Sequence, residues 1–267
     1  MSTQEINRDV PPDQVAALVS RYKQLGATVQ TFPQTNGLTT VVAVFQGAAH
    51  STPFATASVA EILDPVPDTE MAAPPALSRS TAFPDLAAEY LALFNTCRIT
   101  PSKGKEVDAR VDHLIANEAR YRALGTMLRM PWYFIGIVHS MEANFSFTSH
   151  LHNGDPLDAR TIQEPKGRPK TGNAPFTWEQ SASDAFTLKN LVGLSNWDTA
   201  EALYRLEAYN GFGYRSRDVA TPYLWSYSQH YTKGRFVADH VFNPNAVSKQ
   251  AGAAVLLKAL QAKALTL

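Results

Sequence analysis

The chain has 267 residues and lacks several features that would point directly to a function. A single cysteine, Cys97, excludes an internal disulfide framework and a thiolate zinc cluster, and we expect it to be a small buried hydrophobe. Lys and Arg total 24, as do Asp and Glu, so the basic excess of nucleic-acid binders is missing. The apolar fraction of 45% at zero net charge also argues against a disordered chain. We therefore expect a folded protein whose partners do not include nucleic acid.

Long hydrophobic runs are missing too. The most apolar run, 132–138, falls far short of the roughly 20 residues that cross a membrane, so no membrane span is expected. The start, 1–14, has no apolar core region and does not resemble a signal peptide. We expect synthesis in the cytosol and, if the protein acts on a cell wall, signal-independent export or release. The sequence does not indicate its final location.

Nucleotide and nucleophile motifs are absent as well. The chain contains no P-loop, no G-x-G-x-x-G and no G-x-S-x-G. The Gly-Phe-Gly of 211–213 follows a predicted helix rather than a strand, which is the wrong context for a dinucleotide site. We therefore expect no cofactor.

Three regions can be distinguished along the chain. A helix over 13–25 and a hairpin around Asn36-Gly37 predict a small α+β unit spanning 1–63. Five prolines within 64–84 predict a linker, because proline removes backbone donors and favours extended neighbours. The remainder, 85–267, is predicted to be mainly α-helical.

The pattern of apolar residues locates the helices of this larger region. A long segment, 146–176, is rich in Gly, Pro, Asn and Asp, and we expect it to be irregular and functional or mobile. Thr177 with Gln180, and Ser195 with Asp198, form capping-box patterns for two of the helices. The predicted helices span 85–95, 105–124, 132–145, 178–191, 197–209 and about 246–264.

Glu142 is the first candidate for chemistry. It lies near the end of the most apolar predicted helix, where desolvation would raise the pKa of its carboxyl group. A carboxylic acid that stays protonated near neutral pH is what a glycosidase needs to protonate a leaving oxygen. The alternative is a glutamate at a helix end that simply faces water.

A second candidate group is the segment HLHNGDPLDAR, 150–160, which contains His150, His152, Asn153, Asp155 and Asp158. One interpretation is a polar loop that contacts a substrate, with a carboxylate facing Glu142 across a cleft. Another is a metal site, since His-x-His in an extended segment places both imidazoles on one face. A third is an exposed loop whose histidines bond to backbone groups.

Two aromatic stretches add candidate binding residues. The first, 206–215, contains Tyr209, Asn210 and Tyr214 at the end of a predicted helix, and the second, 221–236, contains Trp225 and Tyr231. Aromatic rings stack on the apolar faces of sugars. The alternatives are an ordinary helix end and packing of aromatic rings in a core.

These motifs together resemble goose-type lysozymes and lytic transglycosylases. Glu142-Ala143-Asn144-Phe145 is similar to their Glu-x-x-Phe, and Ala208-Tyr209-Asn210-Gly211 to their Ala-Tyr-Asn-x-Gly, with the glycine one place early. From about 85 to 267 the chain also resembles a bacterial and phage group of lysozyme-family proteins. The shared features are WYFI…H-x-M-E, HLHNGDPL, a PFTWEESA-like segment, YNG-x-GYR, PYLWS and HYTKG.

The resemblance implies a fold and roles for particular residues. It implies a mainly α fold, with a lysozyme-like α+β catalytic domain preceded by the small α+β unit. It assigns the general acid to Glu142 and places Tyr209 and Asn210 in the cleft of a peptidoglycan-cleaving glycosidase. The Gly-Leu-Met-Gln motif of transglycosylases is missing, and HLHNGDPL occupies roughly its place. Hydrolysis and transglycosylation therefore both remain open.

The second catalytic group also remains open. Asp155, or Asp158 as the alternative carboxylate, would activate water or stabilise the oxocarbenium-like state, and Asp155 is our first choice. His150, His152 and Asn153 are expected to contact the substrate. The alternative is assistance from the substrate's own N-acetyl group. Rival functions are a chitin- or chitosan-cleaving glycosidase on the same fold, a non-catalytic wall-binding protein, and a metal-dependent hydrolase built on His150, His152 and Asp155.

Overall fold

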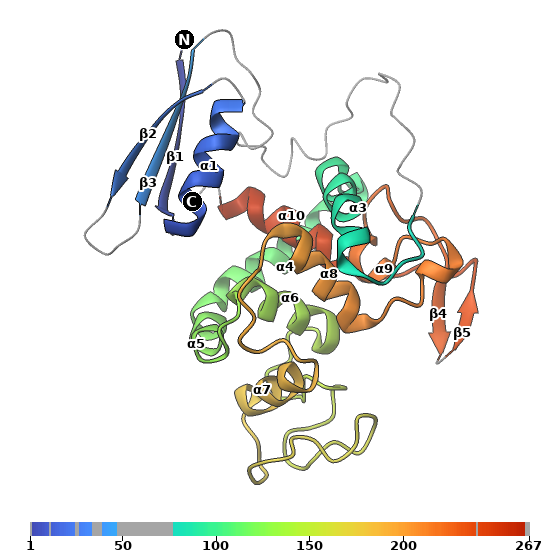
Figure 1. Ribbon diagram of the computed structural model, residues 1–267. Coiled ribbons are helices and arrows are strands. Elements are labelled where there is room, and N and C mark those ends of the chain that lie inside the picture. The colour runs from blue at the N-terminus through green and yellow to red at the C-terminus, as the bar shows by residue number, and fades with distance from the viewer. Residues whose placement is uncertain are drawn as a thin grey trace. The chain divides into compact units, whose positions relative to one another are not determined.

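The computed structural model describes residues 2–10, 12–24, 27–33, 39–46, 77–238 and 240–264. The chain divides into two units, Met1–Ala55 and Thr56–Leu267, and each is treated by itself (Figure 1). Most of the predicted linker, 64–76, lies outside the described residues. The described part is mainly helical, and none of its helices is long and apolar enough to cross a lipid bilayer.

In the residues that the structure describes, the first unit is a three-stranded antiparallel sheet with one helix. The predicted helix and hairpin are confirmed as α1 (Pro12–Gln24), β2 (Thr28–Pro33) and β3 (Thr39–Gln46). The sequence analysis missed β1 (Ser2–Val10), which pairs with β3 and places it in the middle of the order β1-β3-β2. Alternation along β3 buries Val41 and Ala43 with Tyr22 of α1, as expected for a sheet covered on one face.

The second unit begins with helices that surround a central one. α3 spans Phe83–Thr96, with Pro84 in its first turn, where a missing N–H costs little. A 3₁₀ turn, η1 (Pro101–Lys103), leads into α4 (Gly104–Ala116), and α5 (Glu118–Leu128) follows at once.

The prediction of one helix over 105–124 is wrong, because the chain turns at Asn117. The Asn117 side chain donates to the carbonyl of His113, and its backbone dihedrals leave the helical range. This turn lets α5 pack on α6 while α4 packs on α10. The apolar stripe continues through the turn, so spacing alone did not show the break.

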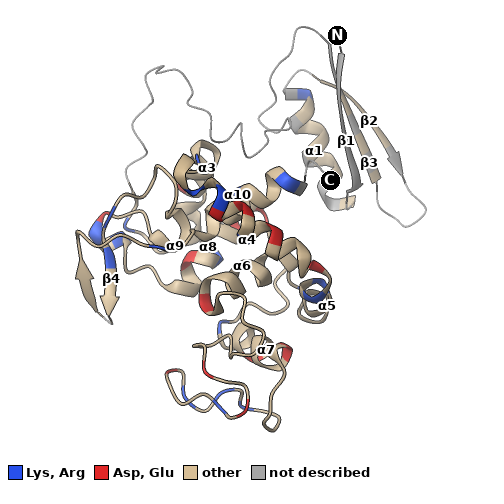
Figure 2. Ribbon diagram, turned by 180° about the vertical axis from the view of Figure 1, so that it is seen from behind, with Lys and Arg blue, Asp and Glu red and all other residues tan. Residues whose placement is uncertain are grey.

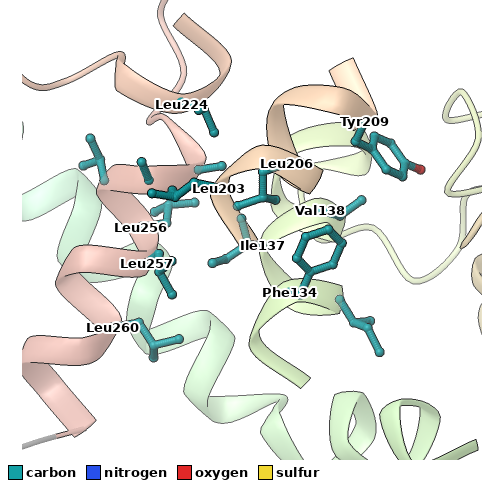
Figure 3. Close-up of a cluster of buried hydrophobic side chains, with 14 of the residues drawn as sticks. Phe134, Ile137, Val138, Leu203, Leu206, Tyr209, Leu224, Leu256, Leu257 and Leu260 are labelled. Carbon is teal, nitrogen blue, oxygen red and sulfur yellow. The ribbon is translucent and has the colours of Figure 1, made fainter. Parts of the chain in front are cut away.

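The central helix, α6 (Trp132–Ala143), is buried on every side from Phe134 to Ser140. Figure 3 shows Phe134, Ile137 and Val138 of this helix in one buried cluster with leucines of neighbouring segments. These neighbours include α8 (Thr199–Asn210), α9 (Pro222–Trp225) and α10 (Ala253–Ala264). At roughly 25 cal/mol per Å² of buried apolar surface, this shared core is the main stabilising contribution to the unit.

The segment 146–176 forms no helix or strand, as predicted, apart from one antiparallel bridge between Ser149 and Pro156. It lies beside α7 (Trp178–Leu188) in both ribbon views (Figures 1 and 2). The predicted capping box is confirmed, since Thr177 accepts from the backbone N–H of Gln180 and the Gln180 side chain accepts from that of Thr177.

Two other helix starts differ from the prediction. The N-cap of α8 is Asp198 rather than Ser195, because the Asp198 carboxylate accepts the backbone N–H of Glu201. The last helix begins at Ala253 rather than near 246. Before it lie the 3₁₀ turn η2 (Arg215–Arg217) and a hairpin of β4 (Arg235–Ala238) and β5 (Val241–Asn243).

Candidate active site

Glu142 lies in the last turn of α6, where the helix stops abruptly. Asn144 and Phe145 both adopt the left-handed conformation, with φ of 45° and 64°, and the Phe145 N–H closes the helix on the carbonyl of His139. His139 itself is buried between the Tyr121 hydroxyl and the carbonyl of Ser146. This contact fixes the start of the irregular segment directly beside Glu142.

The carboxyl of Glu142 is largely desolvated and, within the described part of the chain, accepts one hydrogen bond. The Tyr223 hydroxyl, at the start of α9, donates to its Oε1 at 2.8 Å. Burial raises the pKa of Glu142, and the Tyr223 hydrogen bond and the charge of Lys189 oppose this rise without cancelling it. The site thus holds a carboxylic acid whose proton is retained to higher pH than in water.

A cavity of about 460 Å³ opens at this carboxyl group, and we call it the Glu142 cavity. It lies where α6, α7, α8 and the irregular segment meet. Its volume falls within the roughly 300–1,000 Å³ of small-molecule sites. The described residues that line it are Glu142, His152, Pro165, Ala185, Leu188, Lys189, Tyr209 and Asn210.

A second cavity, of about 600 Å³, is lined by Tyr223 among other residues, and we call it the Arg235 cavity. Tyr223 lines it and donates its hydroxyl to Glu142, and Asn210 lines both cavities. The two cavities are therefore connected through Asn210 and through the hydrogen bond between Tyr223 and Glu142.

The end of α8 contributes the predicted residues Tyr209 and Asn210. The helix stops at Gly211, whose φ of 98° is accessible essentially to glycine alone. The buried Tyr209 has its carbonyl bonded by Lys189 Nζ at 2.8 Å, while Asn210 is exposed to both cavities. Burial, with the nearby charge of Glu142, raises the pKa of the Tyr209 hydroxyl, so it stays a neutral donor.

Tyr214, also predicted to bind, lines the Arg235 cavity. Its hydroxyl accepts the backbone N–H of Phe236 at 3.1 Å, and its ring packs edge-on against that of Phe236. It therefore attaches β4 to the end of α8 and contributes an aromatic wall.

Asp155, our first choice for the second catalytic group, is instead engaged by its own loop. Its Oδ2 accepts the backbone N–H groups of Ile162 and Gln163 and the side-chain amide of Asn153. These bonds, that of Gln163 above all, lower the pKa of Asp155. Asp155 lines neither cavity, so the structure favours a role in holding the loop.

Two further predicted contacts also organise this loop. Asn153 donates to Asp155 and to the carbonyl of Gln163, and accepts the N–H of Asp155. His150 is fully buried, with Nε2 on the carbonyl of Ala159 and Nδ1 on Ser181 Oγ. These two side chains are occupied by protein groups rather than directed at a ligand.

His152 is the one member of this segment's predicted set that lines the Glu142 cavity. Its Nε2 lies 2.8 Å from Asp184 Oδ2, and Arg168 pairs with the same carboxylate oxygen at 2.8 Å. Burial lowers the pKa of His152 despite the partial compensation from Asp184. The ring is therefore held in place and neutral near neutral pH.

Asp184, His152 and Ser181 are arranged like a nucleophilic catalytic triad, but the serine hydroxyl is not accessible to a substrate. Ser181 Oγ lies 3.3 Å from His152 Nδ1, yet it also contacts His150 and accepts the N–H of Leu151. Ser181 is fully buried. A hydroxyl so enclosed has no path to a substrate carbonyl, and the network serves to orient His152.

Trp225 and Tyr231 are core residues, in place of the sugar-stacking role expected from the sequence. Trp225 is 2% exposed and Tyr231 8%, and neither lines a described cavity. Trp225 packs edge-on against His230, and the Tyr231 hydroxyl accepts the N–H of Ser248.

No metal centre is found in the described part of the chain. No three His, Cys, Asp or Glu side chains there are grouped to hold an ion. His150, His152 and Asp155, proposed above as ligands, each bond to protein groups instead.

Two residues of the site were missed in the sequence analysis. Tyr223 lies within the aromatic stretch 221–236 but was not chosen as a candidate, and Lys189 was not considered. Both are remote from Glu142 along the chain, and helix ends bring them to it. No local pattern signals such a contact.

Comparison with known proteins adds no assignment: no protein-family model, curated protein or solved structure matches the chain.

Proposed function

We propose that this protein is a glycosidase that cleaves the β-1,4 bond between amino sugars of peptidoglycan, with Glu142 as general acid. The observation that carries this proposal is the desolvated Glu142 carboxyl, which opens into one cavity and is hydrogen-bonded by a tyrosine of the next. The resemblance of the Glu142 and Tyr209-Asn210 motifs to lysozyme-like enzymes supports it. The meeting of these motifs at one cavity supports it further.

In the proposed reaction Glu142 gives its proton to the glycosidic oxygen as the bond from that oxygen to the anomeric carbon breaks. The raised pKa keeps the proton available to higher pH than a solvent-exposed glutamate would. As the proton leaves, the Tyr223 hydroxyl and the charge of Lys189 stabilise the new carboxylate. The same contacts thus assist the step that burial alone would oppose.

The developing positive charge on the sugar needs a second group. Among the described residues that line the Glu142 cavity, Glu142 is the one carboxylate. This favours the second mechanism considered above, in which the N-acetyl group of the substrate assists from the opposite face. His152, fixed by Asp184, then positions the sugar. The same arrangement is compatible with either a reducing or an anhydro product.

The test is digestion of purified sacculi by the wild type and by Glu142→Gln, with soluble fragments identified by mass spectrometry. We expect muropeptides from the wild type alone. Glu164→Gln is the matched control, because Glu164 is exposed on the irregular segment and lines neither cavity. It should cut as the wild type does.

The other outcomes separate the rival functions. Release of fragments from chitosan or chitin oligomers but not from sacculi would favour the chitin-type glycosidase. Binding to sacculi without any release, unchanged in Glu142→Gln, would indicate a non-catalytic wall protein. Equal cutting by wild type and Glu142→Gln would refute the role of Glu142.

A further inference from the structure

The Arg235 cavity concentrates positive charge. Arg235 of β4, Lys249 and His240 line it, and of the described residues that line it none is an Asp or Glu. Asp239, in the hairpin turn, lies outside the described residues. Acidic and basic residues balance over the whole chain, so the excess of basic side chains around the Arg235 cavity is a local feature. β4 carries a basic segment in Figure 2.

The charged side chains of Arg235 and Lys249 keep nitrogen atoms that are available to a ligand. The Nε of Arg235 donates to the carbonyl of Phe236, but within the described part of the chain its two terminal nitrogens form no hydrogen bond or ion pair. Within the described residues, Lys249 Nζ likewise forms no hydrogen bond or ion pair. The Lys249 carbonyl accepts a hydrogen bond from the Tyr227 hydroxyl, which fixes the backbone at this position. A guanidinium with a free planar edge suits bidentate binding of a carboxylate.

The hairpin that presents Arg235 is held firmly. The Phe236 N–H bonds to the Tyr214 hydroxyl, the Gly234 N–H bonds to the carbonyl of Ala246 at 2.8 Å, and the Phe236 and Phe242 rings pack edge-on. Gly234 has a φ of 97°, and a Cβ there would press on the Phe242 ring. The backbone that carries Arg235 is therefore preorganised, which lowers the entropic cost of binding.

From this arrangement we infer that the Arg235 cavity binds a carboxylate borne by the glycan, next to the sugar whose bond Glu142 protonates. The inference rests on the proposed function for the identity of the polymer. It assigns Arg235 and Lys249 as specificity-determining residues that select an acidic amino-sugar polymer over neutral chitin. The aromatic wall of Tyr214 and Phe236 receives the sugar ring that carries the acid.

Peptidoglycan offers such a carboxylate from two sources. One is the lactyl group of muramic acid once its peptide is removed, and the other is the attached peptide itself. The inference concerns the shared chemistry, and the probes below distinguish the two sources.

The experiment measures binding by titration calorimetry to the full-length Glu142→Gln protein, which is not expected to consume its ligands. Three oligosaccharides of equal length serve as probes: a neutral chitin oligomer, a peptide-free glycan with lactyl carboxylates, and a glycan that still carries its peptides. Arg235→Gln and Lys249→Gln are introduced singly and together. Lys233→Gln is the control, since Lys233 is exposed, bonds to Asn245, and does not line the cavity.

We expect at least one acidic glycan to bind about tenfold more tightly than the chitin oligomer, a difference that corresponds to about 1.4 kcal/mol. Arg235→Gln should remove that preference, Lys249→Gln should weaken it, and Lys233→Gln should leave it within about twofold. High salt should reduce it, because the lysine is exposed. The acidic glycan that loses affinity in Arg235→Gln identifies the source.

Three results would overturn the inference: no preference for either acidic glycan, a preference that survives loss of both cations, or an equal loss of chitin binding in Arg235→Gln. Its failure is distinct from failure of the proposed function. If the protein cuts sacculi and Arg235→Gln leaves its glycan preference unchanged, the proposed function stands and the carboxylate subsite is refuted. If the protein binds acidic glycans through Arg235 but cuts no substrate, the subsite stands and the proposed function is refuted.

Discussion

Removal of one hydroxyl group should change the acidity of Glu142 in a measurable direction. Tyr223→Phe deletes the hydroxyl that donates to Glu142 Oε1 at 2.8 Å and leaves the ring in place. That bond stabilises the carboxylate and lowers the pKa of Glu142 against the effect of burial. Without it, the pKa should rise further.

The size of the change follows from the kind of bond. A hydrogen bond to a charged group contributes about 1.5–3 kcal/mol in a folded protein. One pKa unit corresponds to about 1.4 kcal/mol, so the low end of this range predicts a rise of about one unit. A general acid must be protonated to act, so the alkaline limb of kcat/KM should move to higher pH by the same amount.

Two assays check this prediction. The first is the pH profile of sacculus cleavage, and the second is NMR titration of the Glu142 carboxyl carbon, which does not depend on activity. Tyr231→Phe is the control, because the Tyr231 hydroxyl bonds to the backbone of Ser248 and not to Glu142. An unchanged or lowered pKa of Glu142 in Tyr223→Phe would refute the electrostatic reasoning, whether or not the protein cleaves sacculi.

Three other perturbations have defined outcomes. Burial raises the pKa of Glu142 in the folded protein above the ordinary value of 4.5, so the wild type loses stability as the pH rises through that folded pKa. Glu142→Gln should therefore raise the Tm at neutral pH, and this gain should vanish well below pH 4.5. An unchanged Tm at neutral pH would contradict the desolvation of Glu142. Asp155→Asn should lower the Tm and retain most of the activity, whereas near-complete loss of kcat at unchanged Tm would restore Asp155 as a catalytic group. Gly252→Ala should destabilise by about 1–3 kcal/mol in urea unfolding, because its Cβ would overlap the Leu224 carbonyl; an unchanged midpoint would show that the backbone there can shift.

The elements predicted correctly are those that a local pattern specifies. The capping box at Thr177 and the β-branched hairpin of the first unit both depend on residues within one turn or one pair of strands. The break at Asn117 is different, because the apolar stripe continues through it and only the competing surfaces of α6 and α10 decide where the chain turns. Tertiary packing thus decided an element boundary that propensity left open.

The candidate site was predictable to the same extent. The carboxylate was found from one helix, and the density of polar residues in 150–160 correctly marked an unusual loop. The roles within that loop were not predictable, since the partners of Asp155 are backbone N–H groups that any sequence offers. Trp225 and Tyr231 show the converse error, because an aromatic side chain looks the same in a sequence whether it faces a sugar or a core.

A buried glutamate is by itself a poor general acid, because burial that retains the proton also opposes its release. Rate is favoured when the pKa lies near the operating pH, which requires an opposing influence. In this chain Tyr223 and Lys189 supply it, and each comes from the end of a different helix. The acidity of Glu142 is therefore a property of how α6, α7 and α9 meet. It follows that Lys189→Met should move the alkaline limb in the same direction as Tyr223→Phe, although the two side chains share neither type nor neighbourhood in the sequence.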